Sequence, residues 1–535
     1  LRGAPLPAAP AERAASASAP APTANSIGNA RLPQRRGRRA LYGMLVLAAL
    51  AIAGAGFWLT SPHRLALPSN RPDPAGPLES AVKERSIAVL PFADMSEKKD
   101  QGYFADGMAE EILGVLAKVP RLTVISRTSS FQFKGRDADI KTIGASLGAH
   151  YIVEGSVRKS GARMRINAEL VDTGNGTERW SETYDRDAGD AFNVQDEIAA
   201  SIVRALQLAV VGDEEIPARV KPRNPEAYEL YLRGRQALDR FDREGFEQAA
   251  DLYQRALDLD PQFVPAVNAL ADAQVFLTQW GYIPPKVGYE RARRTAQLGE
   301  KLDPNLGEPH WLLATIDLQY DWDWDGARTE LERADAISPR ASHVFLTRGM
   351  LSFSLGRLND AERQLSAAQR LDPLSPNTLF VLGWARFWSG DLPEAESLFR
   401  KALQISPTYE SVHYYLGHVL MVRGDLTAAL GEMKAEPDEE SRLAGIASVE
   451  FAMGRRKESD SVLAKLTQLS ADDWASGIAS VHAIRNEPDA AFQWLDRAFA
   501  QKDEDLYIIK GDPLYKNVAH DPRYTAFLRK MNLPE

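Results

Sequence analysis

The 535-residue chain contains no cysteine. Its absence excludes a disulfide framework, a thiolate metal site and a cysteine nucleophile. Histidine is scarce, with eight residues, and no HExxH pair or histidine–carboxylate cluster occurs. His413 and His418 are five positions apart, so they do not share a helix face. The sequence therefore contains no metal site built on cysteine or histidine.

Phosphate-binding loops are missing too. Neither Gly-x-x-x-x-Gly-Lys-Ser/Thr nor Gly-x-Gly-x-x-Gly occurs, and these are the patterns whose backbone amides bind nucleotide phosphates. The net charge of −9 argues against a nucleic-acid surface on the folded part. We predict a non-enzymatic protein without catalytic residues, cofactor, metal or bound nucleic acid. An enzyme, for example one with a Ser–His–Asp site, is the least favoured alternative.

Charge is absent from one long apolar run, Leu41–Thr60. At about 1.5 Å per residue this run spans roughly 30 Å, the thickness of a bilayer core. Arginines flank only its N-terminal end, which by the positive-inside rule places the N-terminus in the cytoplasm. These arginines are Arg31, Arg35, Arg36, Arg38 and Arg39. We predict a bacterial inner-membrane protein with a single transmembrane helix at 41–60 in the lipid bilayer and residues 61–535 in the periplasm. A nucleic-acid tail for the arginines and a cleaved signal peptide for the apolar run are the alternatives.

The segments around this run have linker compositions. Residues 1–40 are rich in alanine and proline and end in the basic cluster, which predicts a disordered linker. Residues 61–84 are a proline-rich spacer. Because the first residue is Leu1 and a linker normally joins two parts, we expect a further domain upstream.

Residues 85–211 have the pattern of a small mixed α/β domain. Short apolar runs predict buried strands, and apolar residues at helical spacing predict the helices between them. Met164, Ile166, Ala168 and Leu170 alternate with polar residues, which is typical of a strand with one face in water. The predicted elements are strands at Ser86–Phe92, Leu122–Ser126 and on both sides of turns at Ser160–Gly161 and Asn175–Gly176, with helices around 108–116, 140–147 and 192–210.

This region also resembles a known family. "SIAVLPF", "YFADGMAEEIL", "SRTSSFQFKG", "YIVEGSVRKSGARMRINAELVD" and "FNVQDEIA" together are similar to the TolB amino-terminal-like (FlgO-like) domain over nearly all of 86–210. The resemblance implies a non-enzymatic envelope domain that is often coupled to tetratricopeptide repeats behind one membrane helix. In such proteins the cytoplasmic side often carries a winged-helix DNA-binding domain or a nucleotide cyclase domain, and neither is present in this sequence.

A period of 34 residues organises the second half of the chain. Two series of glycines, one of alanines and one pair of prolines recur at this spacing, which predicts stacked helical hairpins. The first glycine lets two helices approach, and the second occupies the turn, where positive φ favours glycine. The series are Gly349, Gly383, Gly417; Gly356, Gly390, Gly424; Ala361, Ala395, Ala429; and Pro373, Pro407. "LGWARFWSGDLPEAESLFRKALQISP" resembles a tetratricopeptide repeat, with Gly383, Gly390, Ala395, Phe399, Ala402 and Pro407 on the signature positions.

We assign residues 224–535 to this solenoid. Earlier hairpins close at Pro261, Pro304 and Pro339, with an inserted loop, "QWGYIPPKVGY", in the second. The signature decays after Gly431, and "DPLYKNVAHDPRYTAFLRKMNLP" is expected to cap the end. The fold class is thus α+β overall: one membrane helix, a small mixed α/β domain and an all-α solenoid.

One motif matches a calcium loop. Asp321, Asp323, Asp325 and Glu332 occupy ligand positions of that pattern, and Gly326 occupies its turn position. The repeat frame instead places the segment 324–337 in a helix, and a calcium loop needs extended backbone there. We favour the turn followed by a helix.

The expected binding site is the concave face of the solenoid. In tetratricopeptide repeats the first helix of each hairpin lines this face, and large apolar groups there favour partner binding. We predict a protein or peptide segment anchored by Trp384 and Tyr414, and the alternative is that these side chains only pack the superhelix. The predicted groove residues are His343, Phe353, Phe380, Trp384, Phe387, Tyr414, His418 and Met421.

Two functions remain after these exclusions. The first is the extracytoplasmic sensing and protein-interaction region of a single-pass regulator, with its winged-helix or cyclase output domain upstream. The second is a stand-alone, membrane-anchored envelope scaffold. Fold-level analogy alone does not decide between them.

Overall fold

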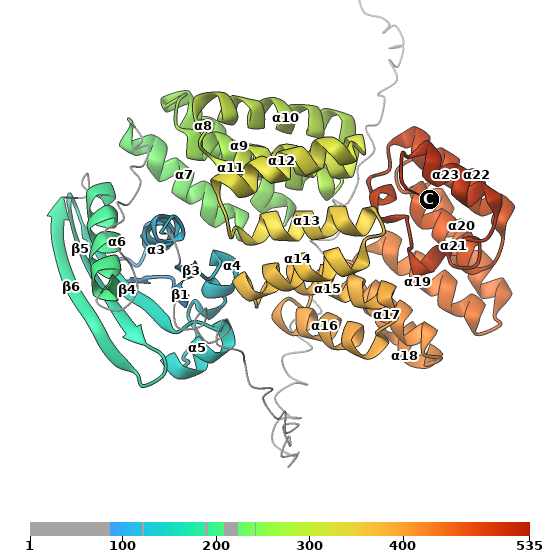
Figure 1. Cartoon of the computed structure of the whole chain (residues 1–535), viewed down its shortest axis with the longest axis horizontal. Coiled ribbons are helices and arrows are strands. Elements are labelled where there is room, and N and C mark those ends of the chain that lie inside the picture. Colours follow the sequence, from blue (N-terminus) through green and yellow to red (C-terminus); the bar gives the residue numbers. More distant parts are fainter. Residues whose placement is uncertain (1–85, 120–121, 188–190, 208–222, 241, 535) are drawn as a thin grey trace, which may run out of the picture. The chain divides into compact units, whose positions relative to one another are not determined.

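The computed structural model describes residues 86–119, 122–187, 191–207, 223–240 and 242–534. The predicted linker, transmembrane helix and spacer at 1–40, 41–60 and 61–84 lie outside these residues. Within the described ranges, no helix combines the length and the apolar character that crossing a membrane requires. The described chain is mostly helical, with a small mixed sheet followed by a helical-repeat solenoid (Figure 1).

The sheet has a parallel part and an antiparallel part. Its order is β3-β1-β4-β5-β6, with β2 also paired to β4. Strand β1 runs parallel to β3 and β4, whereas β4, β5 and β6 form an antiparallel meander. The strands are β1 (Ser86–Val89), β2 (Ala93–Asp94), β3 (Thr123–Val124), β4 (Tyr151–Ser160), β5 (Arg163–Asp172) and β6 (Thr177–Asp187). The meander and its alternation are therefore confirmed, with Met164 and Ile166 buried between exposed Arg163 and Arg165.

Helices cover both faces of this sheet. Met108, Ile112 and Ile198 pack with Val89 and Ile166 on one face, and Ile143 and Leu147 pack with Ala88 and Ile152 on the other. The helices are α3 (Gly102–Ala117), α4 (Arg127–Ser130), the 3-10 turn η2 (Phe131–Phe133), α5 (Ile140–Leu147) and α6 (Ala191–Gln207). The sequence analysis did not predict α4 or β2, because both are too short to show a period.

Helix α4 joins the sheet region to the solenoid. The guanidinium of Arg127 donates two hydrogen bonds of 2.6 Å to the carboxylate of Asp239, and its Nε lies 3.0 Å from Glu110. The backbone N–H of Ser126 donates to the carbonyl of Leu371 at 2.7 Å. These contacts reach two hairpins that are more than one hundred residues apart in sequence, so α4 links them through the sheet region.

The solenoid consists of helical hairpins in sequence order, from green α7 to red α22 in Figure 1. The first helices of the hairpins are α7 (Pro225–Leu238), α9 (Val264–Gln279), α11 (Gly307–Ile316), α13 (Ser342–Ser354), α15 (Pro376–Ser389), α17 (Val412–Val422), α19 (Glu439–Ala452) and α21 (Ala475–Ile484). Their partners are α8 (Arg243–Leu259), α10 (Pro285–Leu302), α12 (Trp324–Ile337), α14 (Leu358–Leu371), α16 (Leu392–Ile405), α18 (Leu426–Ala435), α20 (Arg456–Ser470) and α22 (Pro488–Gln501). A short π-helical turn, η4 (Asp317–Asp321), follows α11.

The repeat positions do what the spacing predicts. A Cβ added at Gly383 would lie 2.6 Å from the ring of Phe399, so only glycine allows α15 and α16 to approach this closely. Gly390 ends α15 with a φ of 84°, which an L-residue rarely adopts. Ala395 and Ala402 are fully buried between helices. The repeat register is thereby confirmed.

The helix bounds test two predicted segments of the solenoid, the inserted loop and the helix at 324–337. The predicted inserted loop at 279–289 is wrong in extent, because α9 includes Gln279 and α10 begins at Pro285. The proline-rich composition suggested a loop, but proline is well tolerated in the first turn of a helix. The predicted helix at 324–337 is confirmed as α12, and the side chain of Asp323 caps it by accepting the N–H of Gly326 at 3.0 Å.

The C-terminal segment, residues 503–534, is here called the tail. It contains η5 (Glu504–Ile508), η6 (Pro513–Tyr515) and α23 (Pro522–Lys530). Instead of only capping the last hairpin, it contacts much earlier ones. Tyr289 donates a 2.7 Å hydrogen bond to Glu504, and the indole N–H of Trp324 donates to the carbonyl of Met531 at 2.9 Å. The tail therefore contacts α10 and α12, which lie roughly two hundred residues before it in the chain.

Candidate functional site

An aromatic cluster forms where α15 meets α17. The ring centroids of Trp384 and Tyr415 are 5.2 Å apart, and those of Trp384 and Trp388 are 6.0 Å apart. Phe380 lies 4.7 Å from Trp384, and Phe353 of α13 makes an edge contact of 5.1 Å with Trp388. The repeat spacing brings these rings together, because successive first helices of the hairpins present equivalent positions side by side.

The predicted groove residues divide into two groups by exposure. Trp384, His343 and Met421 are half-buried. The other five are buried in the continuous apolar core of the solenoid: Phe353, Phe380, Phe387, Tyr414 and His418. For these five, the structure agrees with the alternative that they pack the superhelix. Their role in binding a partner stays a prediction.

The sequence analysis missed two residues of the cluster. Trp388 and Tyr415 each lie one position beyond a predicted groove residue, Phe387 and Tyr414. The repeat template assigned the neighbouring positions to the concave face, so it passed over them. An aromatic doublet in a first helix, such as Tyr414–Tyr415, was the available signal.

His418 lies fully buried beside the cluster. Its ring centroid is 4.4 Å from that of Tyr414, in an edge contact. Neither ring nitrogen has a hydrogen-bond partner among the described residues, and burial lowers the pKa of His418 to about 3. The imidazole is therefore neutral, and it packs as a ring of the core with both nitrogens unpaired among the described residues.

The tail lies against this part of the solenoid. The carboxylate of Asp503 accepts the backbone N–H of Ser476 at 2.8 Å, and Asp505 accepts the indole N–H of Trp474 at 2.6 Å. The hydroxyl of Tyr515 donates to the carbonyl of Ser476 at 3.0 Å. Each of these bonds joins the tail to the first turn of α21 or to its N-cap residue.

The tail also reaches the predicted groove residues. Burial raises the pKa of Tyr414 and Tyr415, and the carboxylates of Asp505 and Asp512 add to this effect. Gly511 lies beside Trp388. The chain's own tail thus lies beside Trp388, and a separate protein segment at the predicted groove residues stays a prediction.

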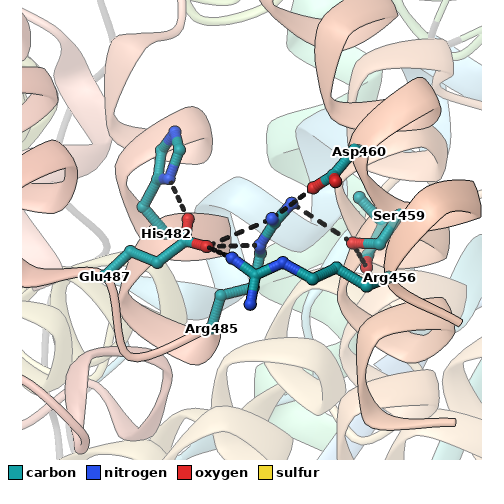
Figure 2. Close-up of polar contacts among 7 residues, drawn as sticks. Arg456, Ser459, Asp460, His482, Arg485 and Glu487 are labelled. Atoms are coloured by element: carbon teal, nitrogen blue, oxygen red, sulfur yellow. Dashed lines mark hydrogen bonds and ion pairs between the residues drawn. The ribbon is translucent and has the colours of Figure 1, made fainter. Parts of the chain in front are cut away.

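A polar network holds the last hairpins together (Figure 2). Arg485, at the end of α21, pairs with Asp460 of α20 and with Glu487, the N-cap residue of α22. Glu487 also contacts Arg456 at 2.9 Å and the Nδ1 of His482 at 2.8 Å. Because every charge in this network has a partner of opposite sign, we assign it a structural role.

The aspartates of the segment that matches a calcium loop bind other groups of the same chain. Arg293 of α10 pairs with Asp317 and Asp321, and Asp323 caps α12. In the described part of the chain, no three histidine, aspartate or glutamate side chains are grouped so that they could hold a metal ion.

Two family models match the chain. The tetratricopeptide-repeat model matches residues 346–410, and the model of the second domain of HilA/YgeH-like transcriptional regulators matches residues 83–201. The second match covers the region that the sequence analysis compared with the TolB amino-terminal-like domain. The matching family is thus a different one, and the TolB-like relation stays a prediction.

Similar proteins match parts of the chain. "Putative adenylate cyclase 3" of Rhizobium meliloti (strain 1021) is 41% identical over 237 residues, which are 43% of this chain and 39% of that protein. The chain therefore spans about two fifths of that relative's length.

Solved structures also match parts of the chain. PilF of Pseudomonas aeruginosa is 18% identical, with 38% of this chain and 92% of that chain covered and a TM-score of 0.31. Yeast Tom70 is 15% identical, with 64% and 78% covered and a TM-score of 0.36. Together with the 34-residue period and the hairpins of Figure 1, the family match shows that the C-terminal region of this chain is built from tetratricopeptide repeats.

Proposed function

We propose that this chain is the non-enzymatic sensing and protein-interaction region of a single-pass inner-membrane regulator. The observation that carries the proposal is the tail, because the tetratricopeptide superhelix already holds a protein segment at the start of α21, beside Trp388. Asp503, Asp505 and Tyr515 of this segment form directed hydrogen bonds with Trp474 and Ser476. A surface that binds one segment in this way is suited to segments of other proteins.

Two comparisons support a regulatory role. The sheet region matches a domain of transcriptional regulators, and the similar Rhizobium protein carries the name of a putative adenylate cyclase and is much longer than the matched piece. We propose an output domain of the winged-helix or cyclase type upstream of residue 1. The region 85–211 acts in this proposal as an envelope domain of the TolB-like kind, next to the repeats at 224–535.

The first prediction concerns topology. The one-sided arginine cluster before residues 41–60 predicts that 61–535 lie in the periplasm. A reporter enzyme that is active only in the periplasm, fused after Glu535, should therefore be active. A reporter active only in the cytoplasm should be inactive at the same point, and the reverse pattern would contradict the proposed topology.

The second prediction concerns the aromatic cluster. Trp384 is half-buried at the contact of α15 with Tyr415, so Trp384→Ala should weaken capture of a cross-linked partner by at least about 1 kcal/mol, as truncation of aromatic anchors does. The measurement is quantitative cross-linking in the cell envelope. Leu469→Ala, at an exposed apolar residue of α20, is the control and should leave capture unchanged. Equal capture by both variants would exclude this surface as the binding site.

A further inference from the structure

We propose that residues 503–515 of the tail are a built-in occupant of the binding surface, and that the partner segment that replaces them is acidic and aromatic. This inference rests on the proposed function and names the chemistry of its partner. The sequence of the occupant is DEDLYIIKGDPLY. The contacts of the tail show which chemical groups the surface binds. The polar atoms that the tail leaves unpaired show which groups a partner segment would add.

The surface recognises carboxylates with two fixed donors. One is the backbone N–H of Ser476 in the first turn of α21, which binds Asp503 at 2.8 Å. The other is the indole N–H of Trp474, which binds Asp505 at 2.6 Å. Trp474 and Ser476 are two positions apart in the sequence, as are Asp503 and Asp505, so an Asp-x-Asp pattern fits the two donors.

The same surface accepts apolar and aromatic side chains. Leu506, Tyr507 and Ile508 follow the two carboxylates and are all buried. Tyr515, also buried, donates its hydroxyl proton to the carbonyl of Ser476. An occupant therefore needs carboxylates at its start, a short apolar run and an aromatic residue with a hydroxyl group.

The tail matches the surface incompletely. The indole nitrogens of Trp384 and Trp388 and both ring nitrogens of His418 are buried without a hydrogen-bond partner among the described residues. Where the tail passes this cluster it has Gly511, and a Cβ placed there would be 3.8 Å from the ring of Trp388. The tail thus contributes no side chain beside Trp388, whose indole N–H stays without a partner among the described residues.

The tail starts at the end of α22. Lys502, the residue before it, ends α22 with a φ of 56°, and a left-handed residue is a common helix ending. The ammonium group of Lys502 lies 4.1 Å from the ring centroid of Trp322.

The tail competes with a free partner segment for the same surface, and it is tethered to that surface by the chain. A tethered segment has an effective concentration on the order of millimolar, so a free segment binds weakly until the tail is loosened. Loosening the tail should therefore reveal a site for a free peptide of the same sequence.

The experiment uses the full chain in detergent and a fluorescein-labelled peptide of residues 503–515. The double variant Asp503→Ala with Tyr515→Phe removes two tail bonds to Ser476 and leaves every surface residue intact. It should bind the peptide at least tenfold more tightly than the unmodified chain. Asp472→Ala, at an exposed carboxylate of the same region, is the control and should match the unmodified chain.

A second peptide tests the chemistry of recognition. A peptide with alanine in place of both initial aspartates should bind the double variant at least tenfold more weakly. If the double variant does not fold, Asp505→Ala replaces it, because alanine has no acceptor for the indole N–H of Trp474.

Two results would overturn the proposal: no gain in peptide binding by a folded variant, or equal binding of the acidic and the alanine peptide. Neither result depends on membrane topology or on an upstream domain. A failure here is therefore distinct from a failure of the proposed function, which the reporter fusions test.

Discussion

Replacing Arg485 by alanine should lower the free energy of unfolding by about 3 kcal/mol, the low end of the range for breaking a buried ion pair. Its side chain is only 4% exposed and pairs with Asp460 and Glu487. The guanidinium also lies 5.3 Å from the ring centroid of Phe451. Its removal takes one partner from the carboxylate of Glu487 and one from that of Asp460, both drawn in Figure 2.

Arg456 provides a matched control for this prediction. It contacts the same carboxylate, Glu487, at 2.9 Å, but its side chain is 65% exposed. Exposed ion pairs contribute less than about 1 kcal/mol, so Arg456→Ala should have a small effect. Urea denaturation of both variants measures the difference. Equal losses of stability would mean that burial of Arg485 does not determine its contribution.

Raising the pH should destabilise the tail. Burial, with the nearby carboxylate of Asp505, raises the pKa of Asp503 and of Asp512 to about 7, from an ordinary value of 3.8. The folded state therefore holds protons that the unfolded chain has released. This stability is fully present below pH 3.8 and is lost as the pH rises through 7. At about 1.4 kcal/mol per pKa unit, each group should cost about 2–3 kcal/mol between about pH 5 and pH 8.

The titration of His418 changes the stability of the fold with pH in the opposite direction. Burial lowers its pKa to about 3 from 6.5, so the stability that it contributes is present above pH 6.5 and is lost as the pH falls. A comparison of variants at each pH cancels this effect, because all of them retain His418.

Melting curves at several pH values test the prediction. Asp512→Asn keeps the shape of the side chain and removes one of the titrating groups, so its melting temperature should fall less from pH 5 to pH 8 than that of the unmodified chain, by about half of the tail's effect. Asp521→Asn is the control, because Arg523 lowers the pKa of Asp521 and this group stays ionised over the range. Parallel curves for the Asp512 variant and the unmodified chain would refute the assignment.

Local pattern was enough to identify most of the elements. The 34-residue series predicted the hairpins, because Gly383 and Ala395 have to be small wherever two helices approach this closely. Alternation in 163–172 predicted β5, because a strand with one wet face needs a period of two. Asp323 illustrates the use of two patterns together, since the repeat frame correctly predicted the helix that starts after this residue.

The candidate site depended on contacts that local pattern does not encode. Trp324 meets Met531, and Tyr289 meets Glu504, across roughly two hundred residues of chain. The sequence around one residue of such a contact has no periodic pattern that indicates the other residue.

The sequence by itself thus determined the repeats, the meander and the aromatic positions, because each follows from the spacing of side chains along one or two elements. The tertiary structure alone decided that Tyr414 and His418 are buried and that the tail binds the start of α21. The reason is physical. The burial of a side chain depends on everything that packs against it, including chain segments far away in the sequence.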